Sequence, residues 1–121
     1  MKLNHINLCT SNVAALSGVF ARYFDFRVEQ ATDDYAILHG RDGFFLVLMQ
    51  IGPDSPQVYP SNFPVGFVVD STEQVHAKHE ELRAGGQQPG PIKSFEALGA
   101  TWTAFYCPVG DGIAIEVTFH T

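Results

Sequence analysis

The sequence is short of cationic side chains and of long apolar runs, and each shortage excludes a class of protein. Seven Lys and Arg residues stand against thirteen Asp and Glu, which gives a formal net charge of −6. Because phosphate contacts need clustered positive charge, an acidic chain without a basic run predicts no nucleic-acid partner. No apolar run approaches the roughly 20 residues that span a bilayer, and the first residues lack a secretory hydrophobic segment. We therefore expect no membrane partner and a cytoplasmic protein.

Cysteine is also scarce. Cys9 and Cys107 are the two cysteines among 121 residues, which is too few for a disulfide framework. No basic neighbour in the sequence lowers the pKa of either thiol, so both are predicted to be reduced core residues and not nucleophiles. Hydrophobic residues make up 45% of the chain, enough for the core of a single domain over residues 1–121.

One order of elements occurs twice along the chain. Residues 2–9 alternate in polarity and predict a half-buried strand, with His5, Asn7 and Cys9 on one face. A helix with an apolar stripe follows over residues 13–24, and three short strands complete the half. The pattern β-α-β-β-β then repeats, with a capping box at Ser71 before the second helix.

These repeats define two modules, at about 1–51 and 63–121. A proline-rich linker joins them over residues 52–62, because proline breaks both helices and strand ladders. When the turn at Asp42 is set over the turn at Asp111, Val47 lies over Glu116. In this alignment His5 corresponds to Pro64, each near the start of the first strand of its module.

Three stretches together resemble the vicinal oxygen chelate superfamily, also called the glyoxalase/bleomycin resistance/dioxygenase fold. They are "LNHINLCTSNVAALSGVFARYFDF", "VGFVVDSTEQVHAKHEELRAGG" and "FYCPVGDGIAIEV". The last is similar to the family's ending, with Cys107 in place of an Asp and one extra residue in the turn. The resemblance covers essentially the whole chain.

The resemblance implies an α+β fold of two βαβββ modules, each curling its sheet into a half-open barrel. It also implies a pocket on the concave faces and a homodimer. Members of the family that hold a metal place four ligands in this pocket, and the matching positions here are His5, Val47, Pro64 and Glu116. Only His5 and Glu116 can ligate.

Two protein ligands are too few for a tight metal site, because catalytic sites keep about three and a non-haem iron site needs a second histidine. Asn7 and Cys9 share the face of His5 and are possible substitutes, whereas Gln50 is predicted to point to the opposite face. We expect no cofactor, with a divalent metal on His5 and Glu116 as the alternative. The same two residues can form a general acid/base pair or position a ligand, and the sequence leaves both roles open.

The helix stretch "HAKHEEL" places His76, His79 and Glu80 on neighbouring turns, but its order matches none of the zinc-binding helices. His79 falls on the apolar stripe of the helix, so a structural role is predicted. On the strand before the last, alternation puts Trp102 and Tyr106 on one face, which suits a small-molecule pocket; a core strand is the alternative. A slip of one residue would turn Trp102 towards the helix.

The sequence therefore predicts a binding site for a small organic molecule, without metal, like the bleomycin-resistance branch of the family. The alternative is a metal-dependent lyase, isomerase or dioxygenase that uses His5 and Glu116, so whether the chain is an enzyme stays open. Around these two candidate catalytic residues, the predicted ligand-binding residues are Asn7, Val47, Met49, Pro64, Trp102 and Tyr106.

Overall fold

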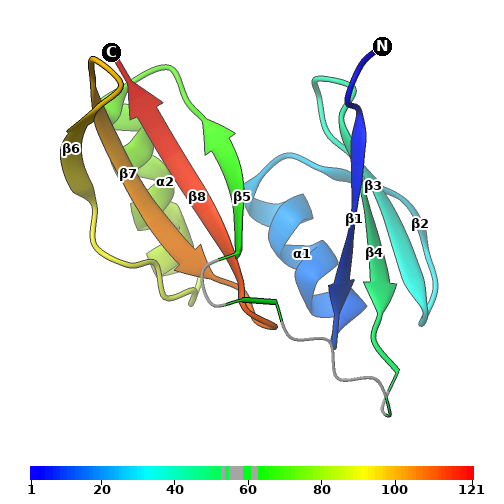
Figure 1. Ribbon diagram of the computed structural model, residues 1–121. Helices are drawn as coiled ribbons and strands as arrows, with labels where there is room; N and C mark the ends of the chain where they lie inside the picture. The colour runs from blue at the N-terminus through cyan, green and yellow to red at the C-terminus, as the bar shows by residue number, and fades with distance from the viewer. Residues whose placement is uncertain (53, 55–58, 61–62) are drawn as a thin grey trace. The chain divides into compact units, whose positions relative to one another are not determined.

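The computed structural model describes residues 1–52, 54, 59–60 and 63–121. The chain divides into two compact units, unit 1 (residues 1–58) and unit 2 (residues 59–121). Each unit contains one helix and one four-stranded sheet in the order β-α-β-β-β (Figure 1), which confirms the predicted α+β fold of two βαβββ modules. Most of the predicted linker lies outside the described residues. The single-domain organisation stays a prediction.

Unit 1 is built on a mixed sheet with the strand order β1-β4-β3-β2. The first strand is parallel to the last, and the other neighbours are antiparallel. Asn12 caps the helix, because its side-chain oxygen accepts a hydrogen bond from the backbone N–H of Ala15. The elements are β1 (His5–Thr10), α1 (Val13–Tyr23), β2 (Arg27–Ala31), β3 (Tyr35–His39) and β4 (Phe45–Gln50).

The core of unit 1 lies between α1 and one face of this sheet. Phe20 of α1 is fully buried, and fully buried leucines of β1, β3 and β4 face the helix because alternate strand residues share a face. Gln50 also belongs to the helix side, since its amide bonds the Ser11 carbonyl. We call the other face, which carries His5 and Val47, the open face of unit 1. The buried leucines are Leu8, Leu38, Leu46 and Leu48.

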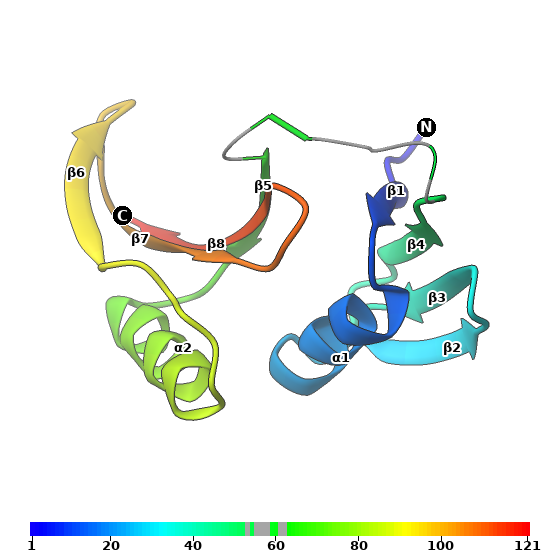
Figure 2. The same ribbon diagram turned by 90° about the horizontal axis from the view of Figure 1, so that it is seen from below.

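Unit 2 repeats this arrangement with the strand order β5-β8-β7-β6, again with its first and last strands parallel. Figure 2 shows the sheet curled, with α2 on its convex side. We call the concave side, which carries Trp102 and Glu116, the open face of unit 2. The elements are β5 (Phe63–Val68), α2 (Thr72–Ala84), β6 (Lys93–Ala97), β7 (Ala100–Pro108) and β8 (Ile113–His120).

The helix of unit 2 begins at the predicted cap with one difference. The Ser71 hydroxyl accepts from the backbone N–H of Gln74, as expected, but the Gln74 side chain accepts from the N–H of Asp70 and not from that of Ser71. His79 packs edge-on against the buried ring of Phe105, with the ring centroids 5.0 Å apart. Its Nε2 also lies 2.9 Å from the Gly90 carbonyl oxygen. His79 therefore has the predicted structural role.

The two turns that were aligned in the sequence have matching geometry. Gly43 and Gly112 have φ values of 84° and 82°, in the left-handed region that favours glycine. In both turns the next residue, Phe44 or Ile113, has a carbonyl that accepts a hydrogen bond from the backbone N–H on the opposite side of the turn, at 2.8 and 3.0 Å. The turns are thus equivalent points from which to compare the units.

Strand pairing extends this equivalence to the first strands. Val47 lies opposite Asn7, and Glu116 lies opposite Gly66. Two residues earlier on the same faces, His5 pairs with Phe45 in unit 1 and Pro64 pairs with Ala114 in unit 2. Within its own sheet, Pro64 therefore occupies the place that His5 has in unit 1.

Candidate functional site

The predicted site residues of unit 1 lie together on its open face. Asn7 and Val47 are directly paired, and His5 is the next residue of β1 on the same side. The side-chain nitrogen of Asn7 lies 3.9 Å from the Met49 sulfur. The pairing of β1 with β4 thus brings four of the predicted residues to one surface.

A stack of three rings crosses the same face. Phe45 lies between His5, at 4.9 Å between ring centroids, and His39, at 5.3 Å, with all three rings nearly parallel. The sequence did not single out His39 or Phe45. Each stands on a predicted strand, but only the pairing register places both beside His5.

The orientation of His5 is set by a neighbour. Its Nδ1 lies 2.8 Å from the side-chain oxygen of Asn4. Because that oxygen can only accept, Nδ1 carries the proton and Nε2 is left as the acceptor nitrogen. A neutral histidine held in this way can accept a hydrogen bond or bind a cation through Nε2.

Beyond His39, the open face of unit 1 ends in a wide polar hollow of about 360 Å³. Arg27 lies opposite His39 in the strand pairing, and its guanidinium forms an exposed ion pair with Glu29 at 2.9 Å. The hollow is lined by Asp25, Arg27, His39, Gly40 and Arg41.

In unit 2, the candidate carboxylate is paired with a phenol. The Tyr106 hydroxyl lies 3.3 Å from Oε1 of Glu116, on directly opposed positions of β7 and β8. Burial, followed by the negative charge of Glu116 and this hydrogen bond, raises the pKa of Tyr106 above its ordinary value. Tyr106 is therefore protonated at neutral pH and donates to the carboxylate, which gives the half-buried Glu116 the partner that a carboxylate between apolar neighbours needs.

The single tryptophan lies on the predicted face. The Trp102 ring stacks with Phe95 (6.4 Å between centroids) on one side and His120 (4.3 Å) on the other. Its Nε1–H donates to the Ala97 carbonyl at 2.9 Å. Since Phe105, an odd step away on the same strand, contacts the helix, Trp102 faces away from α2 and shares the open face with Glu116.

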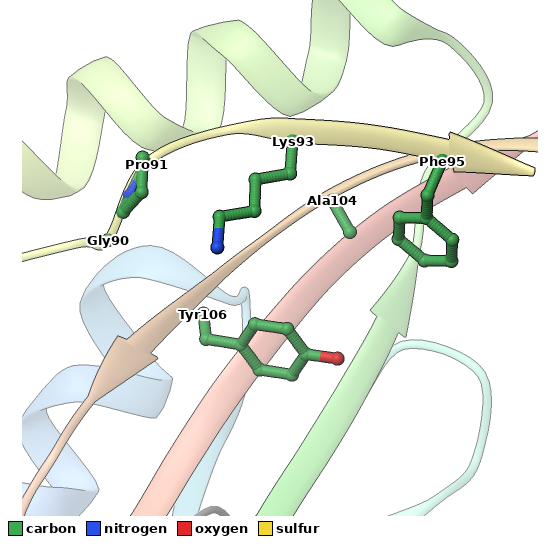
Figure 3. Close-up of a pocket in the computed structure, with 6 residues that line it drawn as sticks. All are labelled: Gly90, Pro91, Lys93, Phe95, Ala104 and Tyr106. Carbon is green, nitrogen blue, oxygen red and sulfur yellow. The ribbon is translucent and has the colours of Figure 1, made fainter.

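A smaller and mostly apolar hollow lies beside these rings (Figure 3). Its volume is about 150 Å³. Of its lining residues only Tyr106 was predicted from the sequence, because Pro89 and Pro91 lower the strand character of the stretch that leads to Lys93. Lys93 and Phe95 are alternate residues after the prolines, and this alternation could have indicated that both lie on one face of a strand beside the hollow. The hollow is lined by Gly90, Pro91, Lys93, Phe95, Ala104 and Tyr106.

The donor set does not fit the metal site of the family. Of the four matching positions, Val47 and Pro64 have no side-chain donor atom. In neither unit do three or more described His, Cys, Asp or Glu side chains gather closely enough to hold a metal ion. His5 and Glu116 belong to different units, so their pairing stays a prediction.

The thiol of Cys107 has the predicted core character. Its side chain is fully buried, and burial raises the pKa of the thiol despite a backbone hydrogen bond from Gln88 that lowers it. A thiol in this state is a poor nucleophile at neutral pH. Cys9 is half-buried on the open face of unit 1.

Across residues 1–52, 54, 59–60 and 63–121, we find no helix long and apolar enough to cross a membrane. None of the curated proteins compared with the chain matches it.

Solved structures with the same fold include a possible glyoxalase from Bacillus cereus, which is 31% identical. The similarity covers 97% of both chains, with a TM-score of 0.79. The genomically encoded fosfomycin resistance protein FosX from Listeria monocytogenes is 20% identical. There the similarity covers 100% of this chain and 94% of that one, with a TM-score of 0.75. A glyoxalase/bleomycin resistance protein/dioxygenase from Nocardioides is 16% identical over 98% and 83% of the two chains, with a TM-score of 0.74.

The model of the Glyoxalase/Bleomycin resistance protein/Dioxygenase superfamily matches residues 2–117, nearly the whole chain. Together with the repeated βαβββ units and their matching turns, this match shows that the chain belongs to that superfamily.

Proposed function

We propose that the chain binds a small organic molecule on its open faces without a metal. The observation that carries this proposal is the chemistry of the four positions that correspond to metal ligands in the family. In each sheet one of the two positions holds an apolar residue, Val47 in unit 1 and Pro64 in unit 2. A single imidazole and a single carboxylate are too few ligands for a catalytic metal.

The surroundings of these positions support binding. Aromatic rings and a few polar groups share each open face, a composition typical of small-molecule sites. In unit 2, Glu116 is held by Tyr106, and in unit 1 the Nε2 of His5 is left as an acceptor. Both groups are suited to fix the orientation of a ligand through hydrogen bonds.

Metal analysis of the purified protein tests this proposal. The chain is expressed without added metal, dialysed against a chelator and analysed for Zn, Ni, Mn and Fe. We expect well under one ion per chain. One ion per chain retained through dialysis would contradict the proposal and favour the alternative.

That alternative is a metal-dependent lyase, isomerase or dioxygenase. It is favoured by one observation: His5 and Glu116 both keep a donor at family ligand positions, and Asn4 orients His5 as outer partners orient metal-binding histidines. In a metal-free enzyme, the same two residues would act as an acid/base pair.

We also propose that the chain forms a homodimer, as the family resemblance implied. A specific interface of this kind buries at least about 1,000 Å². A monomer mass from light scattering at micromolar concentration would contradict it.

A further inference from the structure

The open face of unit 2 has aromatic walls around a floor of small side chains. Phe95, Trp102 and His120 lie side by side across β6, β7 and β8 and form one wall. Tyr106, paired with Glu116, forms the other wall. The walls are four residues apart on β7, which is about 13 Å at the rise of a strand.

Between the walls lies a row of residues that leaves room above the sheet. Ala104 is paired with Lys93 on one side and with Thr118 on the other. Ala104 and Thr118 are buried under the surface and are small. The small side chains between the walls rise less far above the sheet than the aromatic rings on either side. This difference leaves the hollow of about 150 Å³.

The size and lining of this hollow limit what can fill it. An apolar cavity of about 150 Å³ is large enough for one benzene molecule. Phe95 and Tyr106 are 45% and 40% exposed, so a ring placed between them would cover apolar surface that is now in water. Aromatic walls favour an aromatic guest over a saturated one of similar size, because aromatic rings attract one another in edge-to-face as well as offset-stacked arrangements.

Charge selects among aromatic guests. Figure 3 shows the Lys93 side chain extended from β6 across the hollow, with its ammonium group on the side of Gly90 and Pro91. Lys93 forms no ion pair with any residue that the structure describes. The carboxylate of the same face, Glu116, accepts from the Tyr106 hydroxyl and keeps its charge, but it is not among the residues that line the hollow. Among the described residues that do line it, Lys93 is the one that is charged, so the charge at the hollow is positive.

We propose that the hollow formed by Lys93, Phe95, Ala104 and Tyr106 binds a single-ring aromatic anion, with its ring over Ala104 and its carboxylate at Lys93. This inference rests on the proposed binding function and names its ligand class. It uses none of the four metal positions, so the metal analysis does not bear on it.

Three probes of similar size test the proposal: benzoate, cyclohexanecarboxylate and benzylammonium. Calorimetric titration of the full chain gives their affinities, and emission from Trp102 reports whether they bind at this face. We expect benzoate to bind about tenfold more tightly than cyclohexanecarboxylate, because only an aromatic ring makes ring–ring contacts with the walls. Benzylammonium should bind more weakly still, because it meets the charge of Lys93.

Two substitutions locate the site. Phe95→Ala removes an exposed ring and should weaken benzoate binding about tenfold. Lys93→Gln should weaken it about fivefold, since an ion pair in contact with solvent contributes little. The matched control is Lys78→Gln, which removes a lysine that pairs with Glu81 on α2 and should leave benzoate affinity unchanged.

The possible results separate this inference from the proposed function. Equal affinity for benzoate and cyclohexanecarboxylate, unchanged Trp102 emission, or full affinity in the Lys93→Gln variant would overturn it. Tighter binding of benzylammonium would also overturn it, while leaving metal-free binding of small molecules in place.

Discussion

Units 1 and 2 have the same topology but divide the chemistry of the site unequally. Unit 1 has its candidate donor, His5, on the first strand and an apolar Val47 on the last. Unit 2 has the reverse, with Pro64 on the first strand and Glu116 on the last. The two sheets therefore share one strand geometry, but each has a donor at only one of its two positions, and that position differs between them.

The open faces differ in charge and in width. The hollow of unit 1 is wide and lined by two arginines, a histidine and an aspartate. The hollow of unit 2 is smaller and mostly apolar, and Lys93 is the one cation among the described residues that line it. The hollow of unit 2 therefore offers more apolar surface to a flat apolar group, although it is the smaller of the two, whereas the hollow of unit 1 offers mainly polar contacts.

The largest expected effect comes from restoring the missing donors. The Val47→Glu, Pro64→His double variant gives both sheets two donors each and should raise divalent-metal affinity at least about 100-fold, since even outer partners of a ligand are worth 10–100-fold. Metal content after gel filtration and competition with a chelator measure it. The Met49→Glu, Pro64→His variant places the carboxylate two residues further along the same face and serves as control. Equal metal affinity in the two variants would show that the alignment of the units does not define a common centre.

A second comparison concerns the cores. Phe20 of unit 1 and Phe105 of unit 2 are both fully buried, and truncation of either to alanine should lower the free energy of unfolding by about 3–5 kcal/mol. Because we predict one domain, Phe20→Ala should shift the urea transition seen by Trp102 emission, although Trp102 belongs to the other unit.

Circular dichroism and Trp102 emission should then give the same midpoint. Phe20→Leu is a milder version in case the alanine variant does not fold. If Phe20→Leu lowers the midpoint by circular dichroism but leaves the Trp102 transition in place, the units unfold independently and the single-domain prediction is wrong.

The smallest expected effect is in the titration of Tyr106. Its pKa is raised chiefly by burial and further by Glu116, so its phenolate should form above the ordinary value of about 10. The proton is held more tightly in the folded state, and any stability that this contributes is present below about pH 10 and declines as the pH rises through the raised value.

Absorbance of phenolate in wild type and Tyr106→Phe isolates this group. Glu116→Gln should lower the pKa only in part, because burial remains. Tyr35→Phe is the control from unit 1, where the tyrosine hydroxyl accepts from the Gln30 amide and no carboxylate of the described residues is bonded to it. A Tyr106 pKa unaffected by Glu116→Gln would contradict the pairing.

Local sequence patterns predicted the elements because their causes are local. Alternation defined the strands, the capping box at Ser71 marked the start of the second helix, and the aligned turns at Asp42 and Asp111 marked equivalent points. The same alternation placed Trp102 on the open face. These features depend on a few neighbouring residues, so a single sequence was enough.

The unpredicted parts of the site depend on pairing between distant strands. His39 meets His5 through Phe45 only in the observed register. The hollow of unit 2 likewise lies where Ala104 of β7 is paired with Lys93 of β6. Neither arrangement leaves a local signal. Pro89 and Pro91 also lowered the apparent strand character of this part of the sequence, although β6 begins at Lys93, just after them.

Pro64 has a consequence that is separate from ligand chemistry. It lies on β5, at the edge of its sheet, and the backbone N–H groups of Phe63 and Val69 donate towards β8. The nitrogen of Pro64, one residue on from Phe63, therefore faces outwards, where proline is tolerated because no ladder bond is lost. An outward row of N–H groups is what allows a foreign strand to add to a sheet and aggregation to begin. Unit 1 has an N–H at the matching His5, whereas unit 2 lacks that donor. The residue that supplies no metal ligand therefore also makes the edge of β5 a poorer template for the addition of a foreign strand.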